Sequence, residues 1–260
     1  MPELSEKQAY AGLTPDHILD AVESVGLLCD GRFLALNSYE NRVYRIGLED
    51  GEPVVGKFYR PQRWNDEAIL EEHSFTQELA DAEIPVVPPL AFDDNTLLKH
   101  ELFRFALFPN RGGRPPELDN PDHLEQLGRF VGRIHAVGAS KPFQHRPPLD
   151  VQGFAIGPSQ WLLENDFIPN HLVEAYSSLT RDLIEQIGHS YQRAGKVQTI
   201  RLHGDLHPGN ILWTDHGPHI VDFDDARSGP AVQDLWMFLS GDREEMEKGL
   251  ADLLEGYEQF

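Results

Sequence analysis

The most informative segment of the chain reads His203-Gly204-Asp205-Leu206-His207-Pro208-Gly209-Asn210, and Ile220-Val221-Asp222-Phe223-Asp224-Asp225 follows it. Phosphoryl transfer needs a carboxylate that orients the acceptor hydroxyl and takes its proton, and oxygen ligands for the Mg²⁺ that bridges the phosphates. Asp205 fits the first role, whereas Asn210 and Asp222 fit the second. Strands predicted at residues 211–213 and 219–223 would bring Asn210 and Asp222 together, although they lie 12 positions apart. The sequence therefore predicts a kinase.

Other interpretations compete for this segment. His203 and His207 lie four positions apart, as in zinc proteases, but Gly204 and Pro208 disfavour a helix and no glutamate follows His203. Two-metal phosphoesterases also contain Gly-Asp-x-His and Gly-Asn, but they need a histidine directly after Gly-Asn, where this chain has Ile211. An ordinary polar loop is a third alternative, because Asp, Asn and Gly form turns. The order of the polar residues around a predicted hairpin favours the kinase.

A lysine and a glutamate upstream agree with this chemistry. Lys57 lies in an apolar strand predicted over residues 54–59, where a cation needs an anionic partner. In the helix predicted for residues 65–82, Glu72 falls on the apolar stripe and Glu71 points elsewhere. We expect Lys57 to bind the nucleotide phosphates and Glu72 to form an ion pair with it in a cleft between two lobes. The alternative is a lysine that points outward from an edge strand.

No glycine triplet stands where a phosphate-binding loop is expected. The segment between the strands near Leu36 and Val43 reads Asn37-Ser38-Tyr39-Glu40-Asn41-Arg42. Ser38 and neighbouring backbone N–H groups can contact phosphate there, but a polar β-turn explains the same residues equally well.

The remaining pattern predicts an α+β fold of the two-lobed, protein-kinase-like kind, with the active site in the cleft between the lobes. Residues 1–109 are typical of a small β-rich, nucleotide-binding lobe with two hairpins. Residues 110–260 are typical of a larger, mostly helical catalytic and substrate lobe, which begins with a Gly- and Pro-rich linker. In its first helix, Gly128 and Gly132 lie four positions apart and would permit a close helix contact.

Composition restricts the partners and the compartment. The 260 residues include 22 Lys and Arg against 43 Asp and Glu, a formal charge of −21, which disfavours nucleic acid and anionic lipid as partners. Cys29 is the single cysteine, so no intrachain disulfide forms. The N-terminus lacks signal-peptide features and no apolar run reaches membrane-spanning length. We therefore expect a cytoplasmic protein, and we expect a monomer.

With these residues identified, the chain resembles the bacterial stress response kinase A family, the RdoA-type Ser/Thr kinases. That family lies within the group of aminoglycoside-phosphotransferase-like and choline-kinase-like folds. The resemblance covers nearly the whole chain, and several of its motifs are specific to this family. The matching segments are residues 36–44, 57–61, 69–73, 203–213 and 229–237.

The resemblance implies roles for individual residues. Asp205 and Asp222 would be the catalytic aspartates, with Asp205 as the proton acceptor, and Asn210 and Asp222 would bind Mg²⁺. The implied cofactor-binding residues are Ser38, Lys57, Glu72, Leu107 and Asn110. Lys57 and Ser38 would contact ATP, and Leu107 to Asn110 would form the hinge against the adenine. Asp234, at the start of a helix, would support the catalytic loop.

The implied function is an ATP- and Mg²⁺-dependent Ser/Thr protein kinase of bacterial stress response, which acts on a protein substrate. Two features leave a small-molecule kinase of the aminoglycoside, choline or homoserine type as the alternative. His207 stands where eukaryotic protein kinases usually carry a lysine, and only 12 positions separate Asp222 from Asp234, too few for a peptide-docking activation segment. A nucleotide-binding regulator without activity is a third hypothesis. It predicts the loss of a key residue, and none is lost.

The end of the chain raises a further expectation. Met246, Leu250, Leu253 and Tyr257 form an apolar stripe on a helix predicted to begin near Asp242. Proteins that resemble this one usually continue through further helices, so the sequence is expected to be truncated or naturally short. Part of the stripe would then stay exposed or be covered by a neighbouring molecule.

Overall fold

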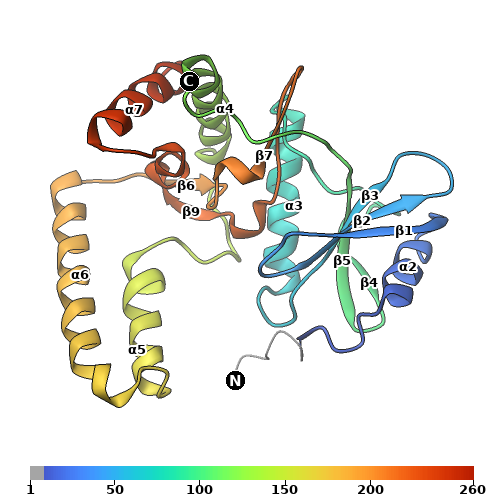
Figure 1. The fold of residues 1–260 in the computed structure, drawn as a ribbon, viewed down its shortest axis with the longest axis horizontal. Helices are drawn as coiled ribbons and strands as arrows, with labels where there is room; N and C mark the ends of the chain where they lie inside the picture. Colours follow the sequence, from blue (N-terminus) through green and yellow to red (C-terminus); the bar gives the residue numbers. More distant parts are fainter. Residues whose placement is uncertain (1–8) are drawn as a thin grey trace. The chain divides into compact units, whose positions relative to one another are not determined.

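The computed structural model describes residues 9–260, which form two compact units (Figure 1). The first unit contains the residues up to Pro116 together with Pro208–Asp224, and the second contains Glu117–His207 and Asp225–Phe260. The segment that carries Asn210 and Asp222 thus belongs to the same compact unit as the N-terminal sheet. The predicted boundary at residue 109 separates a nucleotide-binding lobe from a catalytic and substrate lobe. Because it is defined by function, it stays a prediction.

A five-stranded antiparallel sheet forms the centre of the first unit, in the order β1-β2-β3-β5-β4. In the central strand β3 the side chains alternate between the two faces. Val54 and Phe58 pack with Phe105 and helix α2 in one core cluster, whereas Val55 and Lys57 line a pocket. The strands are β1 (Cys29–Leu36), β2 (Arg42–Leu48), β3 (Val54–Phe58), β4 (Leu98–His100) and β5 (Phe103–Pro109).

Two helices flank this sheet, on opposite sides in Figure 1. Helix α2 (Pro15–Glu23) belongs to the Phe58 side, and α3 (Asp66–Asp81) packs its Ile69 against Tyr59 and Ala106. Asn65 caps α3, because its side-chain oxygen accepts a hydrogen bond from the N–H of Ala68 at 2.8 Å. The helix predicted for residues 65–82 is therefore confirmed.

A two-stranded hairpin completes the first unit, and here one prediction is wrong. β7 (Ile211–Thr214) pairs with β8 (Gly217–Ile220), so the second strand ends at Ile220 rather than at residue 223. The cause is Asp222, whose φ of 63° lies in the left-handed region and takes the chain out of the ladder. The hairpin still brings its ends together, since the N–H of Val221 donates to the carbonyl of Asn210 at 3.0 Å.

The second unit is mostly helical. Its sheet is the antiparallel pair β6–β9. Its longer elements are α4 (Pro121–Gly138), α5 (Gly157–Glu164), α6 (Val173–Ala194), β6 (Thr199–Leu202), β9 (Arg227–Pro230) and α7 (Arg243–Tyr257). Short helical turns also occur along the chain, at η1 (Gln152–Ile156), η2 (Asn170–Leu172), η3 (Pro208–Asn210), η4 (Phe223–Asp225), η5 (Ala231–Asp234) and η6 (Trp236–Phe238).

The close helix contact predicted for Gly128 is confirmed, and the partner of α4 is α7. A methyl group added at Gly128 would overlap the backbone carbonyl of Leu253, and one added at Gly256 would overlap that of Glu125. The α7 stripe is covered unevenly: Leu253 is fully buried, Tyr257 is half-buried and Met246 is 38% exposed. Part of the stripe is therefore exposed, as the sequence predicts.

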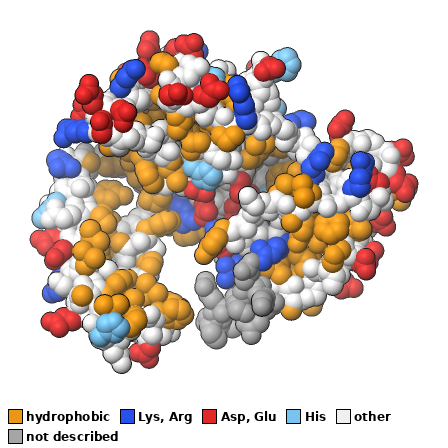
Figure 2. All heavy atoms as spheres, viewed as in Figure 1, with side chains coloured by type: hydrophobic (Ala, Val, Ile, Leu, Met, Phe, Trp, Pro, Cys, Tyr) orange, Lys and Arg blue, Asp and Glu red, His pale blue; other side chains and the backbone are white. Residues whose placement is uncertain are grey.

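Helices α5 and α6 keep their apolar side chains largely at the surface. Neither helix contains a buried residue, and orange side chains gather over both in the lower left of Figure 2. The exposed apolar residues there include Trp161, Leu179, Leu183 and Ile187. Among the residues described by the structure, no helix combines the length and the apolar character that crossing a membrane requires.

Candidate active site

A pocket of about 570 Å³ lies in the first unit, and every residue that lines it belongs to that unit. Its size falls within the range of small-molecule sites. The lining residues come from the sheet, from α3, from the segment after β5 and from the β7–β8 hairpin. Those with polar or charged side chains are Asn37, Arg45, Lys57, Glu72, Thr76, Asn110, Arg111, Asn210 and Asp222. Four residues predicted to act together, Lys57, Glu72, Asn210 and Asp222, therefore line one pocket.

Lys57 is the electrostatic centre of this pocket, because three carboxylates surround its ammonium group. Its Nζ lies 3.1 Å from Asp222 Oδ1, 3.1 Å from Asp224 Oδ1 and 3.5 Å from Glu72 Oε1. Burial alone would lower the pKa of Lys57, but the charges of Asp224, Glu72 and Asp222 together outweigh it and hold the pKa well above its usual value. Lys57 is therefore a permanent cation.

The predicted choice of Glu72 over Glu71 is confirmed by the ion pair to Lys57. Glu72 is 3% exposed and lies on the buried face of α3, whereas Glu71 is only half-buried. Both side chains of the pair are largely removed from water, at 6% exposed for Lys57 and 4% for Glu72. The alternative of a lysine that points outward from an edge strand is wrong, because β3 is central and Lys57 is buried.

Asn210 and Asp222, whose side chains carry oxygen atoms, both line the pocket. Asn210 is buried, and Asp222 is the most accessible of the Lys57 carboxylates, with 47% of its side chain exposed. The left-handed backbone of Asp222 is unusual for a residue with a side chain, and such conformations concentrate at functional sites. A carboxylate and an amide oxygen suit a hard cation such as Mg²⁺.

The loop that carries Asp205 belongs to the second unit, and Asp234 holds it in place. Both oxygens of the fully buried Asp234 carboxylate accept backbone hydrogen bonds at 2.8 Å, from the N–H groups of His203 and Gly204. Asp234 thus supports the loop that carries Asp205, as predicted, although it ends the short helix η5 rather than beginning a helix. Gly204 has a φ of 88°, and a methyl group added there would overlap the carbonyl of Asp225.

A second line of hydrogen bonds connects this carboxylate to the end of the chain. His135 Nε2 lies 3.2 Å from Asp234 Oδ2, and its Nδ1 lies 2.9 Å from the hydroxyl of Tyr257. Burial and, after it, the charge of Asp234 raise the pKa of Tyr257, so its hydroxyl keeps its proton and can donate it to Nδ1. That leaves His135 Nε2 to donate to Asp234.

Asp205 itself is accessible. Its side chain is 41% exposed, and Asp205 Oδ2 lies 3.7 Å from Nε2 of His207. The half-exposed carboxylate suits a group that must reach an acceptor hydroxyl, and its neighbour His207 stands where eukaryotic protein kinases usually carry a lysine.

The proposed nucleotide contacts at Ser38, Leu107 and Asn110 differ in their surroundings. Asn110 lines the pocket, whereas Leu107 is fully buried and its carbonyl accepts a hydrogen bond from the N–H of Leu90 at 2.7 Å. The hydroxyl of Ser38 accepts a hydrogen bond from the N–H of Asn41 at 3.3 Å, which makes a local turn. Asn37, next to Ser38, lines the pocket. The nucleotide roles of these three residues stay predictions.

Asp224 is a partner of Lys57 that was not predicted from the sequence. Its carboxylate is buried and as close to Lys57 as that of Asp222. One signal was available, because Asp222 and Asp224 are two positions apart and the chain is acidic there. Their spacing alone does not place both near Lys57, since the left-handed turn at Asp222 sets the directions of the two side chains.

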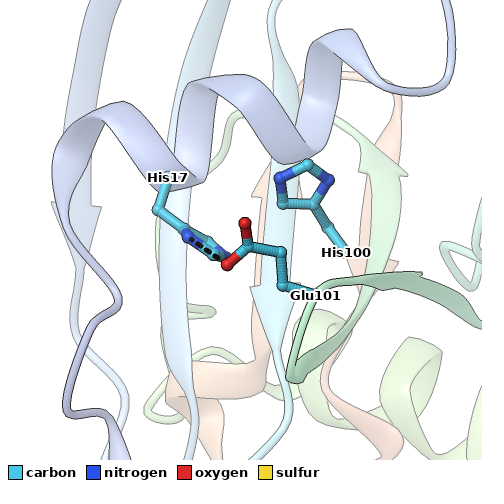
Figure 3. A group of neighbouring side chains, drawn as sticks. All are labelled: His17, His100 and Glu101. Atoms are coloured by element: carbon cyan, nitrogen blue, oxygen red, sulfur yellow. Dashed lines mark ion pairs between the residues drawn. The ribbon is translucent and has the colours of Figure 1, made fainter.

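A further group of titratable side chains lies away from the pocket, between α2 and the β4–β5 turn (Figure 3). His17 Nδ1 lies 3.6 Å from the Glu101 carboxylate, and the rings of His17 and His100 meet edge to face at 5.0 Å. The three potential ligand atoms lie within 4.8 Å of one another, whereas donors around a bound Zn²⁺ are about 3.3 Å apart. Because Glu101 is also 69% exposed, the group is best described as contacts that fasten α2 to the turn.

The sheet with its buried lysine, the adjoining carboxylates and the supported aspartate loop define the class of a phosphotransferase with a kinase-like fold. A family model described as the phosphotransferase enzyme family matches residues 32–260. Solved structures agree on the fold. The chain resembles an amicoumacin kinase complex with AMP-PNP and Ca²⁺, with a TM-score of 0.76, 19% identity and coverage of 98% of this chain and 80% of that one. A microcompartment-associated aminopropanol kinase gives 0.72 at 17% identity, with coverage of 92% and 79%.

Curated relatives narrow the assignment. Stress response kinase A of Escherichia coli strain K12 is 46% identical over 251 residues, which cover 96% of this chain and 76% of the relative. A serine/threonine protein kinase RdoA of Salmonella typhimurium strain LT2 is 44% identical over 250 residues, which cover 96% and 75%. The chain belongs to the phosphotransferase enzyme family and, within it, to the group of the stress response kinases A. It is a kinase.

Proposed function

We propose that the protein transfers the terminal phosphoryl group of ATP to a Ser or Thr hydroxyl of a protein substrate, in a Mg²⁺-dependent reaction that belongs to a bacterial stress response. The observation that carries the proposal is the pocket whose walls include Lys57, Glu72, Asn210 and Asp222. The names of the curated relatives support the protein acceptor and the stress response. We also propose that it acts in the cytoplasm and as a monomer.

Lys57 binds the nucleotide phosphates in this proposal. A lysine that is held by buried carboxylates stays charged and stays in place. It is therefore preorganised for the phosphates before the nucleotide binds. The segment from Leu107 to Asn110 serves as the hinge against the adenine, and Ser38 serves at the phosphate end. Asn110 and the neighbouring Phe108 lie on the pocket wall, which supports the hinge.

Asn210 and Asp222 hold Mg²⁺ in this proposal. Their amide and carboxylate oxygens are hard ligands, and Asp222 is both charged and accessible, so the residues fit this ion. When bound, Mg²⁺ neutralises charge on the phosphates. Lys57 can turn from Asp222 to phosphate oxygens while it keeps Glu72 and Asp224 as partners.

Asp205 accepts the proton of the acceptor hydroxyl. General bases act within hydrogen-bond reach of the proton they take, so the loop must be held firmly. The two backbone hydrogen bonds to Asp234 supply that support.

A small-molecule acceptor is the second candidate, and one observation favours it. The residues between Asp222 and Asp234 fold into two short helical turns and one strand, which leaves no long segment to dock a peptide. The acceptor would then be an amino alcohol or a sugar hydroxyl.

Transfer of labelled phosphate from ATP into a lysate separates the two candidates. The protein fraction and the small-molecule fraction are counted separately, with Asp205→Asn as the inactive control. Label in the protein fraction on Ser or Thr supports the proposal. Label that appears in the small-molecule fraction alone overturns the protein acceptor and leaves the kinase chemistry intact. The absence of Asp205-dependent label in both fractions overturns the proposed function.

A further inference from the structure

The carboxylate of Asp224 contacts a cation with each of its oxygens. Asp224 Oδ1 lies 3.1 Å from Nζ of Lys57, and Oδ2 lies 3.4 Å from Nη1 of Arg63. Its side chain is only 6% exposed. A buried carboxylate whose two oxygens each face a cation is poorly placed to accept a metal ion, whereas the more exposed Asp222 is well placed. Asp224 therefore orients Lys57, and Asp222 remains for the nucleotide and its metal.

Arg63 extends this contact to the loop between β1 and β2. The same Nη1 that faces Asp224 lies 3.1 Å from Oε2 of Glu40. Glu40 lies in the turn that follows Asn37, and Asn37 lines the pocket. A continuous line of ion pairs thus runs from Lys57 through Asp224 and Arg63 to Glu40.

Neighbouring groups hold the far end of this line. Arg60 Nη1 lies 2.8 Å from the same Glu40 oxygen, and the Tyr10 hydroxyl donates to the Glu40 carbonyl at 2.9 Å. The N–H of Arg60 donates to the side-chain oxygen of Asn41 at 3.1 Å. The turn is therefore fastened by its backbone and by its side chains.

The carboxylates around Lys57 differ in their access to solvent. The side chain of Asp222 is 47% exposed, whereas those of Glu72 and Asp224 are 4% and 6% exposed. Asp222 is therefore the carboxylate of the three that a divalent cation can reach.

We propose that Arg63 is a positioning residue for the binding of the nucleoside triphosphate. Through Asp224 it fixes the position of Lys57, and through Glu40 it fixes the position of the 37–41 turn. This inference rests on the proposed function only in that the pocket binds ATP with Mg²⁺. Loss of Arg63 takes one cation away from Asp224 and removes the bridge between the Asp224 and Glu40 carboxylates. The expected result is weaker nucleotide binding rather than the loss of a reacting group.

The test compares Arg63→Met with Arg104→Met. Arg104 is a matched control, because its side chain is 19% exposed against 18% for Arg63 and it pairs with Asp66 outside the line. Affinity for ATP with Mg²⁺ is measured by calorimetric titration, and KM and kcat are measured separately. Arg63→Met is expected to weaken affinity and raise KM about tenfold, with a smaller change in kcat, whereas Arg104→Met stays within about twofold. Arg63→Lys is expected to restore part of the affinity, since a lysine keeps the charge but cannot face both carboxylates as a guanidinium does.

The double variant tests the line itself. Glu40→Gln alone should weaken affinity in the same direction. Added to Arg63→Met, it should weaken affinity by less than it does alone, because the Arg63–Glu40 ion pair is already lost and only the Arg60–Glu40 pair remains to be broken. Additive effects, or normal nucleotide affinity in Arg63→Met, would overturn the proposal. If Arg63→Met does not fold, Glu40→Gln and Arg63→Lys provide the same comparison. A wild-type protein that binds ATP but transfers no phosphate would contradict the proposed function and leave the positioning role standing.

Discussion

The ammonium group of Lys57 lies nearer to Asp224 than to Glu72, at 3.1 Å against 3.5 Å. From the sequence, Glu72 alone is predicted as the partner of Lys57. Two nearly buried carboxylates share this lysine, so its removal takes away the cation that they have in common, although Asp224 keeps its contact with Arg63. The consequence is structural as well as catalytic.

We predict that Lys57→Met lowers the free energy of unfolding by about 3–5 kcal/mol, the usual cost of leaving a buried charge uncompensated. Urea denaturation monitored by circular dichroism measures the difference. Lys99→Met, at an exposed position of β4, is the control and should change little. A Lys57→Met protein as stable as the wild type would show that Glu72 and Asp224 do not depend on the lysine.

Asp205→Asn should abolish phosphoryl transfer with little loss of ATP affinity. The change removes proton acceptance from the loop, whereas the nucleotide pocket lies in the other compact unit and keeps all of its lining residues. General base catalysis contributes about 10²–10⁴-fold, so kcat should fall at least that far. Turnover assays and calorimetry together check both parts, and near-normal turnover would refute the role of Asp205.

Asp222→Asn, in contrast to Asp205→Asn, should change the binding of ATP. Because it removes the accessible carboxylate next to Lys57, nucleotide binding should lose its dependence on Mg²⁺. The measurement is ATP affinity across a Mg²⁺ series, with ATP in the absence of divalent ions as the reference. An unchanged Mg²⁺ dependence would exclude Asp222 as a metal ligand.

Tyr257 should make the protein sensitive to alkali. Its pKa is raised in the folded state, by burial first and then by Asp234, so the stability linked to its proton is fully present below the unfolded value of about 10. That stability is lost as the pH rises through the higher folded pKa. Tyr257→Phe should be less stable than the wild type at pH 7 by about 1 kcal/mol, through the lost hydrogen bond to His135, and this deficit should shrink above pH 10.

Denaturation at a series of pH values checks this expectation. The control is Tyr39→Phe, since the Tyr39 residue is 91% exposed. A deficit for Tyr257→Phe that stays constant through the alkaline range would contradict the linkage.

Two glycine-to-alanine changes should act in opposite directions. Gly128→Ala places a methyl group on the Leu253 carbonyl and should destabilise the protein by forcing α4 and α7 apart. Gly188→Ala, in α6, has open space around the added carbon and should stabilise by about 1 kcal/mol through helix propensity. Thermal melting of the two variants gives the comparison, and equal melting temperatures would be inconsistent with the close contact between α4 and α7 at Gly128.

Features with local signals were predictable from the sequence. Helix α3 followed from its apolar spacing, and α7 begins where Asp242 was expected to start it, with a capping box to Glu245. The pairing of Lys57 with Glu72 followed because the buried stripe of a helix and the alternation of a strand each fix one direction.

Features set by tertiary contacts were not predictable. The strand at residues 219–223 reads as continuous, and only the folded chain shows that Asp222 turns left-handed and ends the ladder at Ile220. Arg63 follows β3 in a turn, where no periodicity indicates its direction. Its contact with Asp224 joins residues 161 positions apart in the sequence, beyond the reach of any local pattern.

The way the chain divides between its two compact units limits how the protein can be dissected genetically. The polypeptide passes from one unit to the other after Pro116, after His207 and after Asp224. A gene fragment that ends at Pro116 would encode the sheet and Lys57 but would lack Asn210, Asp222 and Asp224. Its lysine would then retain only one of its three carboxylates, so a split-protein reporter or an isolated nucleotide-binding domain should be built by grafting the β7–β8 hairpin onto the fragment.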